Sequence, residues 1–283
     1  MAPVKFDDIA KTSKEVLSDD YQISGYQFKA KQKTSLQGMV LTSTVDLFPA
    51  KDSCMTPAKL AWKLPTPFGC PYFAVDKLEL DKAGGIKIEA SSDKALADKS
   101  LKMEAKSDLL DPSKLLATCT YTGIKDAQVK FETKAANPQD CVFECTYASM
   151  VSGAAVTLGL KGTGSTLTAP DLGARMLYGS FFGSLYAKQK LSAFSLSCHY
   201  KASDVLRCAA TYEHGGKMNG QFCLGVSYDV KPGTKVKAKI AQDQSISCSV
   251  KHDVNKGFTV VAGAKVDMNK MDIASCGLQL SIE

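Results

Sequence analysis

The sequence lacks any run of about eighteen apolar residues, the length that a membrane-spanning helix needs. Its 283 residues are 45% hydrophobic and 23% charged, with a mean hydropathy of −0.09. These values are those of an ordinary soluble protein. They do not exclude a transmembrane β-barrel, because lipid-facing and lumen-facing residues alternate along its strands and keep the mean hydropathy near zero.

Arginine is scarce as well, with 33 of the 35 basic residues being lysines. Proteins that read nucleic acids rely on the planar fork of arginine for bases and phosphates, so we expect no nucleic-acid partner. Lysine supplies mobile point charges instead. The net charge of +6 therefore indicates a diffuse attraction for small anions.

The sequence has no C-x-x-C pair among its ten cysteines and contains only three histidines. This excludes the usual zinc sites and predicts that the cysteines are small apolar side chains on a buried or lipid-facing surface. No serine or histidine has the spacing that would pair a nucleophile with a base. The stretch "GLKGTG" lacks the Gly-Lys-Ser/Thr ending of a phosphate loop. We expect neither an enzyme nor a cofactor.

The N-terminus has neither a secretory signal nor an Arg/Ser-rich transit peptide, since five acidic residues fall within its first twenty positions. It does carry the one helical pattern of the chain. An amphipathic helix is predicted from Lys5 to Ser18, too short to cross a bilayer. Its apolar stripe consists of Phe6, Ile9, Ser13, Val16 and Leu17.

After Gly25 the hydrophobic period changes from the helical value to two and stays there to the C-terminus. Alternating segments include residues 26–33, 59–64, 86–90, 101–106, 127–134, 154–161, 258–266 and 274–282. Short turn signals such as "LDPSK", "ANPQD", "VKPGT" and "DVNKG" separate them. About nineteen segments can be counted. The pattern predicts consecutive antiparallel hairpins in one domain of residues 25–283, preceded by a helix and hinge over residues 1–24.

In the segment "GTKVKAKIA" one face of the strand is cationic and the other is apolar. The question is which surroundings each face meets. In a soluble β-sandwich the apolar face would meet a second sheet. In a membrane barrel it would meet lipid, and the lysines would line a watery lumen. Small residues on the apolar faces and the need to close so many strands favour the barrel. So do aromatic residues near strand ends, which fit interfacial girdles: Tyr72, Phe73, Tyr121, Tyr147, Tyr178, Tyr186, Tyr200 and Tyr228.

Three stretches resemble the mitochondrial porin family, the voltage-dependent anion channels, in a plant-like pattern. They are "DIAKTSKEVLSDDYQ", "GLKGTG" at residues 159–164, and the C-terminal stretch from Tyr228 onward. The resemblance covers nearly the whole chain. It implies a single 19-stranded all-β barrel in the mitochondrial outer membrane, with parallel first and last strands and the N-terminal helix inside the lumen. The strand number is a property of that family.

The resemblance also implies a voltage-dependent, weakly anion-selective channel that passes ATP, ADP, phosphate and other small metabolites by diffusion. Its partners would be the lipid bilayer and small anionic metabolites and nucleotides, with room for homo-oligomers or other membrane-complex partners. The candidate anion-attracting residues are Lys11, Lys14, Lys29, Lys31, Lys33, Lys161, Lys235, Lys237, Lys239 and Lys265. A weak nucleotide contact is expected from Lys11, Lys14, Gly159, Leu160 and Lys161.

Two alternatives remain at this point. A Tom40-like protein-conducting pore would keep the architecture and change the cargo, but such pores usually have longer N-terminal extensions and acidic lumenal patches, which are not found here. A soluble β-protein acting as a binding module would place the lysine faces in bulk water.

Overall fold

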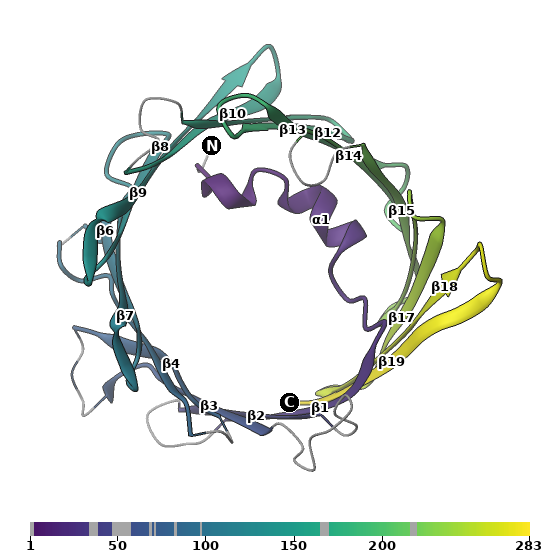
Figure 1. The fold of residues 1–283 in the computed structure, drawn as a ribbon, viewed down its shortest axis with the longest axis horizontal. Coiled ribbons are helices and arrows are strands. Elements are labelled where there is room, and N and C mark those ends of the chain that lie inside the picture. The colour runs from purple at the N-terminus through teal and green to yellow at the C-terminus, as the bar shows by residue number, and fades with distance from the viewer. Residues whose placement is uncertain are drawn as a thin grey trace.

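The strands close into one ring that surrounds the N-terminal segment (Figure 1). The computed structural model describes residues 3–33, 39–46, 58–67, 70, 72–81, 84–96, 98–164, 170–215 and 220–283. Within these residues no helix is long and apolar enough to span a membrane. The single ring confirms the predicted 19-stranded barrel with one N-terminal helix.

The described residues form a short 3₁₀ turn, η1 (Phe6–Asp8), one α-helix, α1 (Lys11–Leu17), and nineteen strands. The strands are β1 (Gly25–Lys33), β2 (Val40–Asp46), β3 (Ala58–Leu64), β4 (Ala74–Asp81), β5 (Ile86–Ser92), β6 (Leu101–Asp108), β7 (Asp111–Tyr121), β8 (Ala127–Lys134), β9 (Asn137–Val151), β10 (Ala154–Thr163), β11 (Asp171–Tyr178), β12 (Phe181–Lys188), β13 (Ala193–Lys201), β14 (Leu206–His214), β15 (Gln221–Lys231), β16 (Thr234–Ala241), β17 (Ser245–Asn255), β18 (Phe258–Asp267) and β19 (Asp272–Ile282).

Each strand pairs antiparallel with the next one along the chain, and β1 closes the ring by pairing with β19 in parallel. The parallel seam runs from Gly25 opposite Gly277 to Ala30 opposite Ile282. It confirms the parallel pairing of first and last strands that the family resemblance implied. Closure leaves none of the nineteen described strands with an unpaired edge, which is the condition for a sheet to lie in hydrocarbon.

The predicted turn signals are wrong in two places. "LDPSK" and "ANPQD" contain the beginnings of β7 and β9, because tight turns at residues 109–110 and 135–136 precede them. Pro112 and Pro138 are therefore the second residues of strands. Proline is tolerated at the start of a strand, where few ladder hydrogen bonds depend on its missing N–H.

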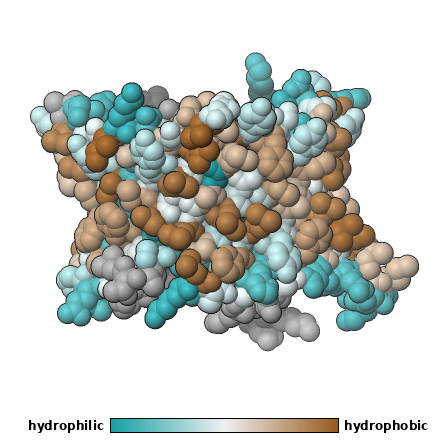
Figure 2. Space-filling view, turned by 90° about the horizontal axis from the view of Figure 1, so that it is seen from above, coloured by the Kyte–Doolittle hydropathy of each residue, from teal (hydrophilic) through white to brown (hydrophobic). Residues whose placement is uncertain are grey.

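Apolar side chains face outward all around the ring. On β16 Ile240 is 52% exposed on the outer wall, whereas Lys237 on the opposite face is 5% exposed inside the barrel. Figure 2 shows the resulting surface, with hydrophobic residues across the middle of the wall and hydrophilic residues at both rims. The alternation therefore separates a lipid-facing surface from a polar interior, as predicted.

Nitroxide labels at two positions of β16 test this separation in bilayers. In a cysteine-free variant, a label at residue 240 should be relaxed by oxygen, which partitions into lipid. A label in place of Lys235 should instead be relaxed by a water-soluble nickel chelate. Equal access of the nickel chelate to both labels would show that the outer face of β16 is not in lipid.

Candidate functional site

The candidate functional site is the lumen, and its main internal feature is the N-terminal segment, residues 3–24. The predicted stripe is the buried face of this segment: Phe6 is 1% exposed, Ile9 0% and Val16 3%. Figure 1 shows the segment lying along one side of the ring, against the wall that contains β12–β15. The stripe is covered by barrel wall, so the prediction of an amphipathic helix inside the lumen is confirmed.

The predicted continuous helix from Lys5 to Ser18 is wrong, because the segment is interrupted between η1 and α1. The hydroxyl of Tyr186 donates a hydrogen bond to the Phe6 carbonyl at 2.8 Å and accepts one from the Ala10 N–H at 3.3 Å. In a continuous α-helix that carbonyl and that N–H would bond to each other. An inserted side chain of this kind is a recognised cause of helix interruption.

Tyr186 is also a correction to the predicted aromatic girdle. The other seven aromatic residues of that prediction are exposed by 38% or more, but Tyr186 is 5% exposed. Its ring lies 5.4 Å from the Phe6 ring, centroid to centroid. Tyr186 therefore lies in the lumen, where it contacts the N-terminal segment, and not at the membrane interface.

Glycines in the wall allow the segment to approach the strand backbone closely. A Cβ atom on Gly173 would lie 2.7 Å from Cδ1 of Ile9, and one on Gly159 would lie 2.9 Å from both Ile9 and Phe6. At Gly225, a Cβ atom would lie 2.5 Å from Cδ2 of Leu17. Any side chain at these three positions would occupy the space of the apolar stripe.

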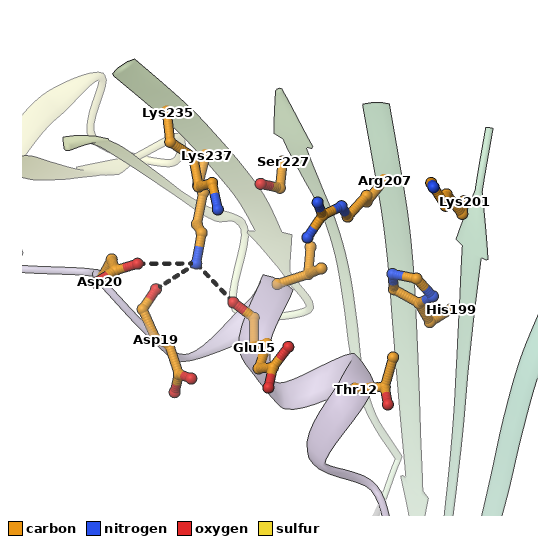
Figure 3. A pocket seen from close by; sticks show the side chains of 11 residues that line it. Thr12, Glu15, Asp19, Asp20, His199, Lys201, Arg207, Ser227, Lys235 and Lys237 are labelled. Atoms are coloured by element: carbon orange, nitrogen blue, oxygen red, sulfur yellow. Dashed lines mark hydrogen bonds and ion pairs between the residues drawn. The ribbon is translucent and has the colours of Figure 1, made fainter. Parts of the chain in front are cut away.

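Two lysines of β16 hold the C-terminal end of the segment through backbone carbonyls, and Figure 3 shows the contacts of one of them, Lys237. Lys237 Nζ donates to the carbonyls of Glu15 at 2.6 Å and Asp19 at 3.0 Å, and Lys239 Nζ donates to the carbonyl of Leu17 at 2.7 Å. The carbonyls of Glu15 and Leu17 belong to the last turn of α1, where the helix dipole is negative, and Asp19 follows the helix. The two lysines thus act as caps supplied by the wall.

Asp20 connects the hinge to β16 and β17. Its carboxylate lies 3.1 Å from Lys251 Nζ and 3.5 Å from Lys237 Nζ. Burial raises the pKa of Asp20, but the hydrogen bonds and charges of the two lysines outweigh burial and hold this pKa below its ordinary value of 3.8. The backbone of Asp20 is left-handed, with φ of 59°, a conformation that Asp and Asn tolerate.

Lys161 connects the N-terminal end of the segment to the wall. Its Nζ lies 3.0 Å from the Asp7 carboxylate and 2.8 Å from the carboxylate of Glu144, which is itself 3.6 Å from Lys130 Nζ. Glu144 is 3% exposed and lies between two lysines.

Lys161 and Glu144 are directly paired across β10 and β9. Following such pairs from strand to strand away from the N-terminal segment identifies the lumenal face of the wall that the segment does not cover. Glu144 pairs with Lys130, Lys130 with Thr120, and Thr120 with Lys102. Directly paired residues share a face of the sheet. By the same register, the lumenal side of β3–β6 carries Lys59, Lys63, Lys77, Lys87, Lys102, Lys106, Glu79, Glu89 and Glu104.

Most of these charges form ion pairs across neighbouring positions, for example Lys106 with Glu89 at 3.4 Å. Lys87 is exposed, and no described carboxylate lies within 4.0 Å of its Nζ. None of these residues was among the predicted site lysines. The signal was present in the alternation, but alternation alone does not say which part of the wall the N-terminal segment leaves open.

The remaining predicted residues lie in several places. Lys11 and Lys14 are exposed on α1, while Lys235 and Lys265 are paired with Asp229 at 3.6 Å and Asp243 at 3.1 Å. Lys29 donates to Gln279 at the seam, and Lys31 and Lys33 both contact Glu283.

Two positions of the predicted nucleotide contact face other surroundings than the open lumen. Leu160 is on the outer wall, 45% exposed, and Gly159 is covered by Phe6 and Ile9. Lys161 and Gly159 therefore both contact the N-terminal segment, which carries Lys11 and Lys14, whereas Leu160 does not. In the described part of the chain, no group of three or more His, Cys, Asp or Glu residues could hold a metal ion.

Comparison with known proteins identifies a family. The eukaryotic porin family matches residues 2–277. No curated protein matches the chain. Among solved structures, the chain is similar to a doubly substituted porin from Rh. blastica, with 10% identity, 90% of this chain and 94% of that chain covered, and a TM-score of 0.44. A triply substituted form of that porin is 11% identical, with 93% of this chain and 96% of that chain covered and a TM-score of 0.43.

Gly173→Val tests whether the wall glycines seat the segment. The valine side chain would overlap Ile9, Phe6 and Tyr186, and overpacking of this kind costs about 1–3 kcal/mol. The amides of α1 should therefore exchange with deuterium faster than in the unsubstituted protein, as measured by mass spectrometry. Gly183→Val is the matched control, because a Cβ at Gly183 meets only Phe181 of the outer face. Unchanged exchange in Gly173→Val would contradict the seating.

The hinge should loosen in acid. Because the pKa of Asp20 is lower in the docked hinge than in a free one, its ion pairs stabilise docking fully above the free value and lose that effect as pH falls below about 4. A nitroxide at Ser18 should become more mobile between pH 6 and pH 3. Asp20→Asn should remove this pH dependence, and an identical acid transition in that variant would assign it to another group.

Proposed function

Because the chain belongs to the eukaryotic porin family, we propose that it is a voltage-dependent, weakly anion-selective channel of the mitochondrial outer membrane. Its cargo is ATP, ADP, phosphate and other small metabolites, which cross by diffusion. The chain is a pore-forming membrane protein by family and by fold. The membrane, the selectivity and the voltage dependence are the content of the proposal, which assigns no catalytic step to any residue.

The observation that carries the proposal is the division of the lumen into a covered and an open wall. The N-terminal segment lies on β9–β17 through its apolar stripe and the lysine contacts, and the wall of β3–β6 keeps its charged side chains facing the lumen. A diffusing solute meets this open wall and the exposed face of α1. Both carry lysines, including Lys11, Lys14 and Lys87.

Pairing explains why the selectivity should be weak. The open wall alternates lysines with carboxylates, and opposite charges held a few ångströms apart cancel most of their field beyond the Debye length of about 8 Å. The net charge of +6 leaves a small positive excess over the whole chain. A lumen of this kind enriches anions modestly without binding them tightly, which permits rapid exit.

The N-terminal segment supports voltage dependence because it is charged, lies within the lumen and is attached by non-covalent contacts. Displacing one elementary charge through 100 mV changes its energy by about 2.3 kcal/mol. This is comparable with the cost of breaking a few hydrogen bonds of the kind that Lys237 and Lys239 make. Weak contacts of passing nucleotides with Lys11, Lys14 and Lys161 belong to the same proposal.

Planar-bilayer recording tests the proposal. In a KCl gradient the open channel should give a reversal potential that indicates a modest preference for chloride, and conductance should fall at high voltage of either sign. An absence of conductance steps, or a clear preference for potassium in the open state, would rule the function out. Lys87→Glu should lower the chloride preference, because it reverses an unpaired charge on the open wall.

Lys125→Glu provides the matched control, since Lys125 is exposed in the turn between β7 and β8, outside the lumenal rows. The net charge changes by the same amount in both variants. An equal shift in reversal potential for Lys125→Glu and Lys87→Glu would mean that total charge, and not the open wall, sets the selectivity.

A further inference from the structure

Two cavities flank α1, and their charges differ. The first, of about 470 Å³, places Glu15, Asp19 and Asp20 of the N-terminal segment opposite Lys201, Arg207, Lys235 and Lys237 of the wall (Figure 3). Acidic and basic groups are nearly balanced there. The one positive charge in excess is offset by Asp229, whose carboxylate lies 3.7 Å from Arg207 and 3.6 Å from Lys235 Nζ.

The second cavity, of about 430 Å³, lies on the other side of α1 and is named here the Lys188 cavity. Its charged lining consists of Lys14 on α1, Lys188 at the end of β12, Lys239 on β16, and Glu213 on β14. Three ammonium groups thus share the cavity with one carboxylate. No described carboxylate lies within 4.0 Å of any of the three ammonium nitrogens.

The two wall lysines are held in place by contacts that include no carboxylate. Lys188 Nζ lies 4.8 Å from the centroid of the Tyr186 ring, and Lys239 Nζ lies 4.4 Å from that of Tyr21. Lys239 also donates to the Leu17 carbonyl. Cation–π contacts and carbonyl acceptors orient an ammonium group without neutralising it. The cavity therefore contains more positive charge than the single carboxylate of Glu213 can balance.

Hydroxyl groups complete the lining. Ser195, Ser197 and Thr211 border the cavity, and Ser197 pairs directly with Thr211 across β13 and β14. Hydroxyl donors beside ammonium groups are the usual partners of phosphate oxygens, because each oxygen of a phosphate accepts more than one hydrogen bond. Carboxylates or chloride would use fewer of these donors.

We propose that the Lys188 cavity is a binding site for a phosphate group, held between Lys14 of α1 and Lys188 and Lys239 of the wall. The proposal rests on the proposed channel function for the supply of phosphate-bearing metabolites in the lumen. Since the site is complete only when α1 lies on the wall, the bound anion stabilises the docked segment by its differential affinity for that state.

Pyrophosphate is a suitable probe, compared with chloride at the same ionic strength. In the full-length protein reconstituted in nanodiscs, the ³¹P resonance of pyrophosphate should broaden on addition of protein, and the amides of α1 should exchange more slowly with deuterium. Lys188→Gln should weaken both effects about tenfold, the expected result of losing one charge-assisted hydrogen bond. Lys188→Arg should restore most of the binding.

Lys87→Gln is the matched control, because it removes a lysine from the open wall and leaves the Lys188 cavity intact. Equal loss of binding in Lys87→Gln and Lys188→Gln would assign the broadening to the whole lumenal field and overturn the site, as would no broadening with the unsubstituted protein. If Lys188→Gln does not fold, Lys14→Gln on the exposed face of α1 gives the same test. KCl conductance is measured separately, so a failed site with normal conductance is distinct from a failed channel.

Discussion

The parallel pairing of β1 with β19 is the contact on which the rest of the molecule depends. Without it the sheet would have two free edges in hydrocarbon, where unpaired N–H and C=O groups are costly. The seam also decides where the chain enters the lumen. Gly25 begins β1 opposite Gly277, and the backbone of residues 22–24 passes so close to Gly263 and Gly277 that no Cβ would fit at either position.

The N-terminal segment shows which features of the barrel interior can be predicted from the sequence and which cannot. The spacing of Phe6, Ile9, Val16 and Leu17 was sufficient to predict one buried face, because period and burial are local properties of a helix. The interruption at Ala10 depends on Tyr186, which is distant in sequence. The sequence around a tyrosine near the end of a strand does not show whether its side chain faces lipid or the lumen. The register that turns Tyr186 inward belongs to the whole barrel.

The lysines give a similar lesson. Alternation predicts that Lys235, Lys237 and Lys239 share one face of β16, since side chains of a strand alternate between its faces. It could not show that Lys237 and Lys239 are engaged by carbonyls of the segment, nor that Lys59 and Lys87 face open lumen. It also places Leu160 on the outer wall, because that residue alternates with Lys161. Contacts between elements, and not the periodicity of any one of them, divide equivalent lysines into structural and solvent-facing ones.

The one-sided seating of the N-terminal segment has a mechanical consequence. An arc of wall reinforced from within by packed side chains and hydrogen bonds resists bending more than a bare arc of the same single-layer sheet. Lateral pressure from the bilayer would therefore deform the cross-section unevenly, flattening β3–β6 before β12–β16. The barrel thus has one stiff side, and we expect changes in its shape to concentrate in the wall of β3–β6.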